Sequence, residues 1–297
     1  MRAAASRLNP TPGSPDMVYQ PVIPLAGYGG WKFLESTFDK QFEGYSDSAG
    51  VKNDRAYFED KMSSPISMED FLSDKRLLRI ALTAFDLGGE EWKVGFIRHV
   101  MEENADPEST FLKRLNNQSY TNFATTFGLN DGMISLSADT ISTLADDFEL
   151  AGFRSAVGEV DNNMKLSLNY QAKIGELVRE GSSDSANLYR ILGDVPVRTM
   201  LETALNLPTS WQELDVDRQA EILKERMLSV FSISRVTDIT NEDVVEKAIQ
   251  RFHTMDSILN GQESLSSGSV ALTLLNNAAG FGSSASQNLF LSIVSSG

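Results

Sequence analysis

Apolar residues recur along this chain at intervals of three and four positions, the spacing that places side chains on one face of an α-helix. The first such stripe consists of Trp31, Leu34, Phe38, Phe42 and Tyr45. Similar stripes continue to Met255, whereas the alternation of apolar and polar positions that marks strands is nearly absent. The pattern predicts an all-α fold with a multi-helical body.

Two of the predicted helices resemble each other. Segment 72–87 is similar to segment 192–207, which lies 120 positions later. In each segment the predicted helix begins at an Asp suited to helix capping, Asp74 or Asp194. Each ends at a helix breaker, Gly88 or Pro208. Any two capped amphipathic helices share such features, but the identical spacing favours an internal duplication of a helical unit. The apolar faces expected to be buried are Leu77, Ala81, Ala84 and Phe85, matched by Val197, Leu201, Ala204 and Leu205.

Turn signals and composition divide the chain into four parts. Residues 1–17 read as a flexible leader, in which Met17 is an alternative start. Residues 18–130 form a first helical unit and residues 131–260 a second unit packed on it, with the turn signal Asn130-Asp131-Gly132 as the joint. Within the first unit, Asp106-Pro107 predicts the start of a helix.

The fourth part, residues 261–297, is a tail rich in Ser, Gly and Asn that contains no Lys or Arg. Two apolar islands interrupt it, at 270–275 and 289–294. The islands either fold back onto the body or become ordered on a partner, and aggregation is a third outcome. If they bind a partner, the candidate binding residues are Leu274, Leu275, Phe290 and Ile293.

Composition narrows the function classes. The 297 residues include 41 acidic and 26 basic side chains, for a net charge of −15. This balance argues against a nucleic-acid partner and against an anionic membrane surface. Cysteine is absent, which excludes disulfides and thiolate chemistry. No apolar run approaches the roughly 18 residues of a membrane span, and the leader lacks the apolar core of a Sec signal. We expect no membrane insertion.

The search for catalytic motifs finds little. His99 and His253 are the only histidines, and no HxxxH or HExxH spacing is present, so both are expected to be structural. Phosphate-binding loops and the GxSxG motif are missing, and segment 238–243 lacks the glycine of a calcium loop. The sequence predicts no cofactor, no metal and no enzymatic activity. A hydrolase with a pair of carboxylates remains a distant alternative.

The run Ser67 to Leu87, SMEDFLSDKRLLRIALTAFDL, resembles the hallmark sequence of an alphaproteobacterial family, domain of unknown function 1217. The resemblance extends from about Val18 to Met255. Further similar segments are 110–115, 120–128, 153–158, 161–169, 192–211 and 215–219. The resemblance implies an all-helical protein that is often encoded in flagellar gene clusters, with no assigned enzymatic activity and no catalytic residues to transfer.

Two functions from different classes follow. The resemblance implies a non-enzymatic structural or assembly protein of the bacterial flagellum. The protein is made in the cytoplasm without a Sec signal, and whether the flagellar system exports it stays open at this point. Acidity, lack of cysteine and the polar tail are compatible with this role. The alternative is a cytoplasmic adaptor or regulator that binds a protein helix in a groove between the two helical units. Both functions require a protein partner.

Overall fold

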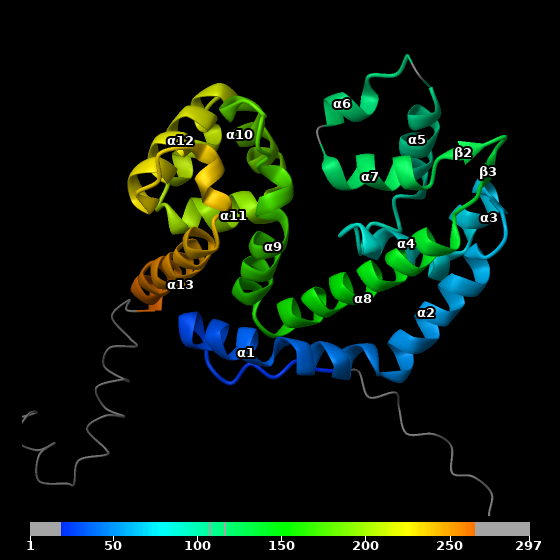
Figure 1. Ribbon diagram of the computed structural model, residues 1–297, viewed down its shortest axis with the longest axis horizontal. Helices are drawn as coiled ribbons and strands as arrows, with labels where there is room; N and C mark the ends of the chain where they lie inside the picture. The colour runs from blue at the N-terminus through cyan, green and yellow to red at the C-terminus, as the bar shows by residue number, and fades with distance from the viewer. Residues whose placement is uncertain (1–18, 107, 116, 265–297) are drawn as a thin grey trace, which may run out of the picture.

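Helix α8 (Ala138–Val160) organises the protein because it contributes to two separate hydrophobic cores. Leu144 and Phe148 belong to the first core, and Phe153 and Val157 belong to the second. The structure is a computed structural model that describes residues 19–106, 108–115 and 117–264. The two cores form two lobes, which α8 joins (Figure 1).

The first lobe contains the first half of α8 and a group of shorter elements. Its antiparallel three-stranded sheet has the order β1-β3-β2. Asp131 and Gly132 connect β2 to β3, and both have the positive φ that a tight hairpin turn requires. The other elements are α2 (Ala49–Met62), β1 (Ile66–Ser67), α3 (Met68–Ser73), α4 (Lys75–Ala84), α5 (Val94–Ala105), α6 (Phe111–Leu115), α7 (Gln118–Thr126), β2 (Leu129–Asn130) and β3 (Met133–Ile134).

The second lobe contains the last part of α8 and the helices that follow it, and α1 packs against it. Among these helices, α11 packs between α9 and α13. The elements are α1 (Gly27–Ser46), α9 (Asn162–Leu177), α10 (Asp184–Gly193), α11 (Val195–Ala204), η1 (Thr209–Glu213), α12 (Val216–Phe231), η2 (Val236–Thr240) and α13 (Glu242–Ser264).

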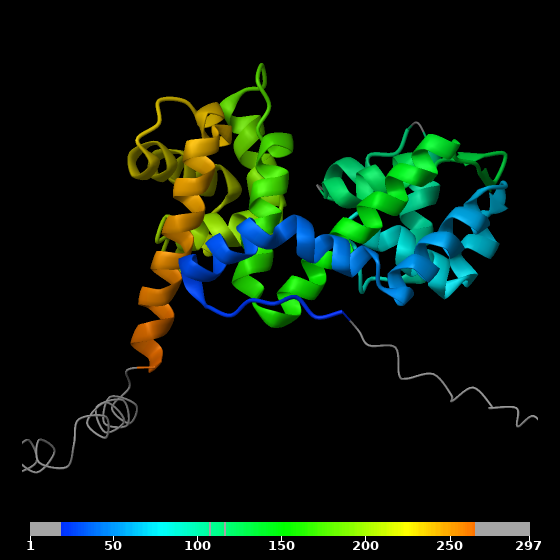
Figure 2. The same ribbon diagram turned by 60° about the horizontal axis from the view of Figure 1, so that its bottom comes forward.

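Helix α1 is a second connection between the lobes. Its Trp31 and Leu34 are fully buried in the second core, whereas Tyr45 at its far end packs against both cores. The extended segment before α1 is fixed to it by Gln41, which accepts a hydrogen bond from the Val22 amide at 2.7 Å and donates one to the Val22 carbonyl at 3.1 Å. Figure 2 shows α1 running from the side of α13 toward α2.

The two similar helices of the sequence are α4 and α11, and they begin in the same way. Asp74 accepts a hydrogen bond from the Leu77 amide at 3.0 Å, and Asp194 accepts one from the Val197 amide at the same distance. Each aspartate satisfies an amide that has no partner within its helix. Both N-caps predicted from the sequence are therefore confirmed.

The ends of α4 and α11 also match. Asp86 and Asn206 follow them at equivalent positions, with φ of 57° and 52°. Aspartate and asparagine tolerate this left-handed conformation better than most residues do. In each copy the next leucine amide, from Leu87 or Leu207, donates to a carbonyl five residues earlier at 2.9 Å. These shared features support duplication of a helical unit.

The two apolar faces differ in their last turn. Val197, Leu201, Ala204 and Leu205 are all fully buried, as expected. In the first copy, Leu77 and Ala81 are buried, but Ala84 and Phe85 are only partly buried at the edge of the core. The second copy is more enclosed because Phe231, Val236 and Phe252 complete the same core as α11.

Some sequence-based boundaries lie elsewhere in the structure. The turn at Asn130–Gly132 is present, but it is a hairpin inside the first lobe, and the division between the cores falls within α8. The helix expected to start at Asp106 starts at Phe111 instead, because Asp106 binds the Glu108 amide in a local turn. The leader 1–17 lies outside the described residues, and so does the tail beyond Ser264.

No helix within residues 19–264, apart from the two gaps, is long and apolar enough to cross a membrane.

Candidate functional site

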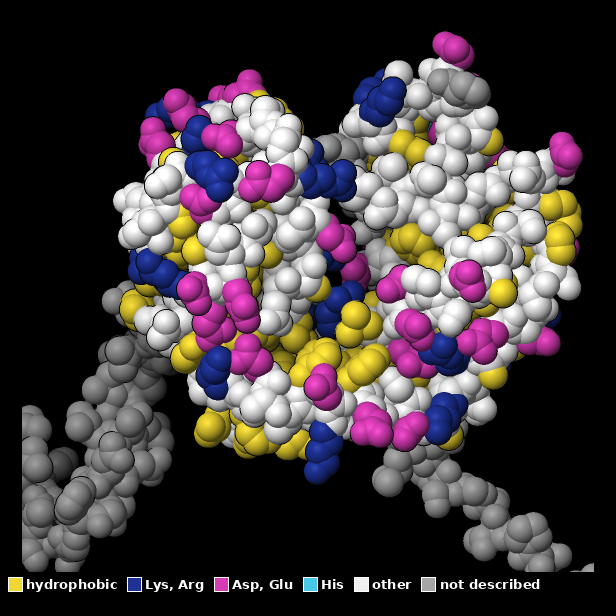
Figure 3. All heavy atoms as spheres, viewed as in Figure 1, with side chains coloured by type: hydrophobic (Ala, Val, Ile, Leu, Met, Phe, Trp, Pro, Cys, Tyr) yellow, Lys and Arg dark blue, Asp and Glu magenta, His cyan; other side chains and the backbone are white. Residues whose placement is uncertain are grey.

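A cleft of about 720 Å³ lies between the two lobes. The first lobe contributes the turn after α4, the end of α5 and the start of α7. Helix α8 lines the cleft through Arg154 and Ser155, and the second lobe contributes α9 and the junction of α10 with α11. Figure 3 shows basic and acidic side chains together in the hollow between the lobes.

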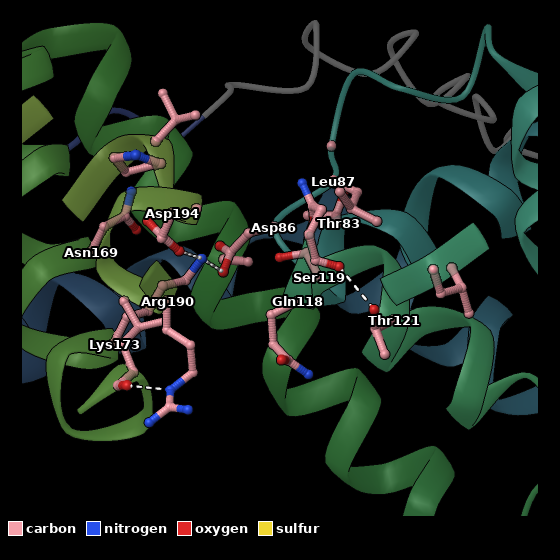
Figure 4. Close-up of a pocket in the computed structure, with 18 of the residues that line it drawn as sticks. Thr83, Asp86, Leu87, Gln118, Ser119, Thr121, Asn169, Lys173, Arg190 and Asp194 are labelled. Atoms are coloured by element: carbon pink, nitrogen blue, oxygen red, sulfur yellow. Dashed lines mark hydrogen bonds and ion pairs between the residues drawn. The ribbon is translucent and has the colours of Figure 1, made fainter. Parts of the chain in front are cut away.

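An ion-pair network crosses the cleft. Lys173 on α9 lies 3.1 Å from Asp86 in the first lobe and 3.4 Å from Asp194 in the second. Arg154 on α8 lies 3.1 Å from the other Asp86 oxygen. Figure 4 shows Asp86 and Asp194 directed toward the Lys173 amine. The network therefore connects the C-terminal turn of α4 to the N-cap of α11, the two helices that resemble each other in sequence.

The two acidic partners of Lys173 offset the cost of burying its charge. Its side chain is 17% exposed, and burial by itself disfavours the ammonium form. The carboxylates of Asp86 and Asp194 outweigh that effect and raise the pKa of Lys173 above its ordinary value. Lys173 is therefore a permanent positive charge at neutral pH, and it holds the two lobes together.

Two polar atoms in the lining of the cleft have no hydrogen-bond partner within the described part of the chain: Asn169 Oδ1 and Arg154 Nε. Asn169 is only 5% exposed and lies one helical turn before Lys173 on α9. An unsatisfied buried amide costs free energy unless water or a ligand satisfies it. The amide of Asn169 is therefore a candidate contact for a ligand.

Three further basic side chains, Lys113, Lys165 and Arg190, line the cleft without forming an ion pair to any described residue. Arg190 instead donates from Nε to the Leu177 carbonyl at 2.6 Å and also binds Asn187. Burial, and then the neighbouring Arg179, lower the pKa of Arg190. The unpaired positive charge comes from both lobes, because Lys113 belongs to α6 and Lys165 to α9.

The two histidines lie apart from the cleft and from each other. His253 on α13 is 1% exposed, its Nε2 is 3.0 Å from Ser167 Oγ, and its ring stacks on Trp31. Ser167 is also fully buried, so this pair has no access to a substrate. His99 on α5 is exposed and lies 3.6 Å from Glu103. Within the described residues, no group of histidine and acidic side chains could hold a metal ion.

The candidate binding residues of the tail, Leu274, Leu275, Phe290 and Ile293, lie outside the described residues. The structure instead brings together residues that the sequence did not mark, chiefly Lys173, Asn169 and Arg154. The available signal was partial: Asp86 and Asp194 stand at the ends of the repeated helices, but their shared partner comes from a third helix. Only the folded arrangement shows that they meet.

Comparisons with known proteins extend the description. The X-ray crystal structure of a protein from Agrobacterium tumefaciens, determined by a structural genomics consortium, is similar to this chain with a TM-score of 0.62 and 22% identity. The match covers 85% of this chain and 99% of that one, and at this identity it shows the fold alone. No curated protein matches. The model of a family described as "Protein of unknown function (DUF1217)" matches residues 84–245, a shorter span than the sequence resemblance suggested. The chain belongs to this family of proteins of unknown function, DUF1217.

Proposed function

We propose that this protein is a non-enzymatic binding protein that accepts a segment of another protein in the cleft between its lobes. One observation carries the proposal: the cleft is lined from both copies of the duplicated helix and includes a buried amide without a partner. A groove between helical units is a common way to hold a helix or an extended peptide. Lys173 and Arg154 keep the two walls of the groove together.

The state of the carboxylates favours binding over hydrolysis. A pair of acids that works on a substrate needs carboxyl groups able to accept or donate a proton. In this cleft Asp86 and Asp194 are bound by Lys173, and Glu103 accepts a hydrogen bond from Ser109. The fourth acid, Asp106, accepts one from the Glu108 amide at 3.0 Å. These acids maintain the structure of the cleft walls.

Two tryptophan substitutions on the same helix test the site. Ser155 on α8 is exposed and lines the cleft, whereas Ser142 is exposed on α8 outside it. Ser155→Trp should obstruct the cleft. The partner that copurifies with the wild-type chain from native cells, identified by mass spectrometry, should then be lost. Ser142→Trp should retain it. If the partner still binds Ser155→Trp in a purified two-component assay, the cleft is not its site.

The biological setting that we propose is the bacterial flagellum, with the protein acting in structure or assembly. Support comes from the gene-cluster association of the resembling family and from the acidic, cysteine-free composition of the chain. A deletion strain should lose motility. Secretion separates this role from a cytoplasmic adaptor: a strain without a working flagellar export gate should stop releasing the protein only if it is an exported component.

A further inference from the structure

The cleft carries positive charge on a strongly negative protein. The chain has a net charge of −15, yet Lys113, Lys165 and Arg190 face the cleft without an acidic partner among the described residues. Two acids of the cleft, Asp86 and Asp194, are neutralised by Lys173 and Arg154. The other two, Glu103 and Asp106, lie on the first-lobe wall with Lys113 and form no ion pair with a Lys or Arg among the described residues. The second-lobe wall therefore keeps two cations, Lys165 on α9 and Arg190 on α10, that no lining acid balances. A ligand at that wall meets positive charge, although most of the molecule would repel an anion.

Two helices also direct their N-termini into the cleft from opposite lobes. The α7 terminus contributes Asn117, Gln118 and Ser119 to the lining, and the α11 terminus contributes Asp194 and Val195. A helix N-terminus carries partial positive charge. At α11 the Asp194 carboxylate balances this charge, but α7 is capped by neutral Asn117. The end of α7 therefore adds positive charge to the first-lobe wall, which holds Glu103 and Asp106 as well as Lys113.

Asn169 indicates that the ligand is a peptide. Its side chain is more than nine-tenths buried, lines the cleft between Lys165 and Lys173 on α9, and leaves Oδ1 unpartnered. An unpartnered amide oxygen needs a hydrogen-bond donor, and the N–H groups of a polypeptide backbone are donors of this kind. Figure 4 shows Asn169 on the wall opposite Gln118 and Ser119, so a strand of peptide between them would contact both lobes.

We propose that the occupant of the cleft is an acidic segment of a partner protein, whose carboxylates meet Lys113, Lys165 and Arg190 while its backbone binds the Asn169 amide. This inference rests on the proposed binding function and names the chemistry of the partner. The tail of this chain is excluded as the occupant because residues 265–297 contain no charged side chain. Nucleic acid has a higher density of negative charge than an acidic peptide and would meet the same cations with more repulsion from the body, and the test below includes it as the alternative occupant.

The test uses the full chain and a short fluorescein-labelled peptide of alternating Glu and Ala, blocked at both ends. A peptide with Gln in place of each Glu is the matched control, and labelled single-stranded DNA is a third probe. We expect the Glu peptide to bind more tightly than the Gln peptide. Its affinity should fall as salt is added. The double variant Lys113→Glu/Lys165→Glu should lower the affinity for the Glu peptide by roughly threefold to tenfold. Lys40→Glu, an exposed lysine on α1 outside the cleft, should leave its affinity unchanged.

Every other result counts against the inference. Equal binding of the Glu and Gln peptides, or no binding of the Glu peptide by the wild type, would overturn it. Tighter binding of the DNA probe would show that the cleft selects phosphates instead. If Ser155→Trp loses the native partner while the double lysine variant keeps it, the acidic chemistry is wrong but the binding site stands. If both variants keep the partner, the proposed function fails as well. Thermal unfolding of each variant verifies that the body remains folded.

Discussion

The Lys173 ammonium lies 3.1 Å from the Asp86 carboxylate, so a single ion pair connects α9 of the second lobe to the turn after α4 of the first. Asp86 adopts a positive φ, which directs its side chain away from α4 and toward this partner. Lys173 also binds Asp194, the N-cap of the duplicated helix. One side chain thus contacts the same structural unit twice, at its end in one copy and at its start in the other.

Replacing Lys173 should loosen the contact between the lobes. Lys173→Met leaves Asp86 with Arg154 alone and leaves the Asp194 carboxylate unpaired, and we expect it to lower the free energy of unfolding by about 1–3 kcal/mol. Urea denaturation measures this loss, and small-angle scattering should show a larger radius of gyration. Lys224→Met is the control, because Lys224 pairs with Asp184 at an exposed site and should cost less than about 1 kcal/mol. Equal losses in the two variants would contradict the role given to Lys173.

The caps of the duplicated helices should contribute unequally despite their identical geometry. Asp74→Ala removes the cap hydrogen bond and the hydrogen bond that Asp74 accepts from the Tyr57 hydroxyl at 2.5 Å. Water can replace the second bond because Tyr57 is only partly buried, so the variant should cost about 1 kcal/mol in chemical denaturation. Asp194→Ala removes an equivalent cap and also a partner of Lys173, so its cost should be larger. Asp39→Ala on the exposed side of α1 serves as a neutral comparison. A larger cost at Asp74 would contradict this ranking.

Truncation in the last turn of each helix should also differ between the copies. Leu205 is fully buried, and Leu205→Ala should lower the free energy of unfolding by about 2–5 kcal/mol, the usual cost of a core cavity. Phe85 is only partly buried, so Phe85→Ala should cost less than the roughly 3–5 kcal/mol of a buried phenylalanine. The measurement is urea denaturation of both variants. A loss at Phe85 equal to that of a buried ring would show that solution packing is tighter there.

His253 should make stability depend on pH in the acid range. Burial lowers the pKa of His253 to about 4, and the nearby Asp161 only partly opposes this shift. The unfolded chain takes up the proton near the ordinary pKa of about 6.5. Stability is therefore complete above that pH and falls as the pH drops toward 4, by on the order of 3 kcal/mol. The slope should be smaller in His253→Gln but unchanged in His99→Gln, which alters an exposed histidine. Both variants should keep partner binding, because neither histidine lines the cleft.

Removing residues 265–297 should leave the helical body folded, because the described residues already form two close-packed cores. Circular dichroism and the urea midpoint should remain close to those of the full chain. If the apolar islands bind a partner, truncation and the substitutions Leu274→Ser, Leu275→Ser, Phe290→Ser and Ile293→Ser should each weaken partner association or motility. A truncated protein that unfolds would instead indicate that the islands cover the body.

Local patterns predicted local structure well. The caps at Asp74 and Asp194, the turn at Asp131-Gly132 and the helical stripe from Trp31 depend on neighbouring residues and could be read directly from the sequence. The division of the cores could not, because α8 has one continuous apolar pattern whose two halves face different partners. The cleft was equally hidden. Each of its charged side chains, considered alone in the sequence, is typical of an exposed position. Only folding brings Lys173 to Asp86.

Because α8 joins the two lobes, its length sets how the lobes are oriented relative to each other. Each residue of an α-helix advances the chain by about 1.5 Å and rotates it by about 100°. One residue inserted between Phe148 and Phe153 would turn the second lobe about the axis of α8 by that angle and carry Lys173 away from Asp86. Helix α1 would resist the turn, because its own side chains are fixed against both cores. The number of residues in α8 and α1 therefore sets the angle between the lobes and, with it, the width of the cleft.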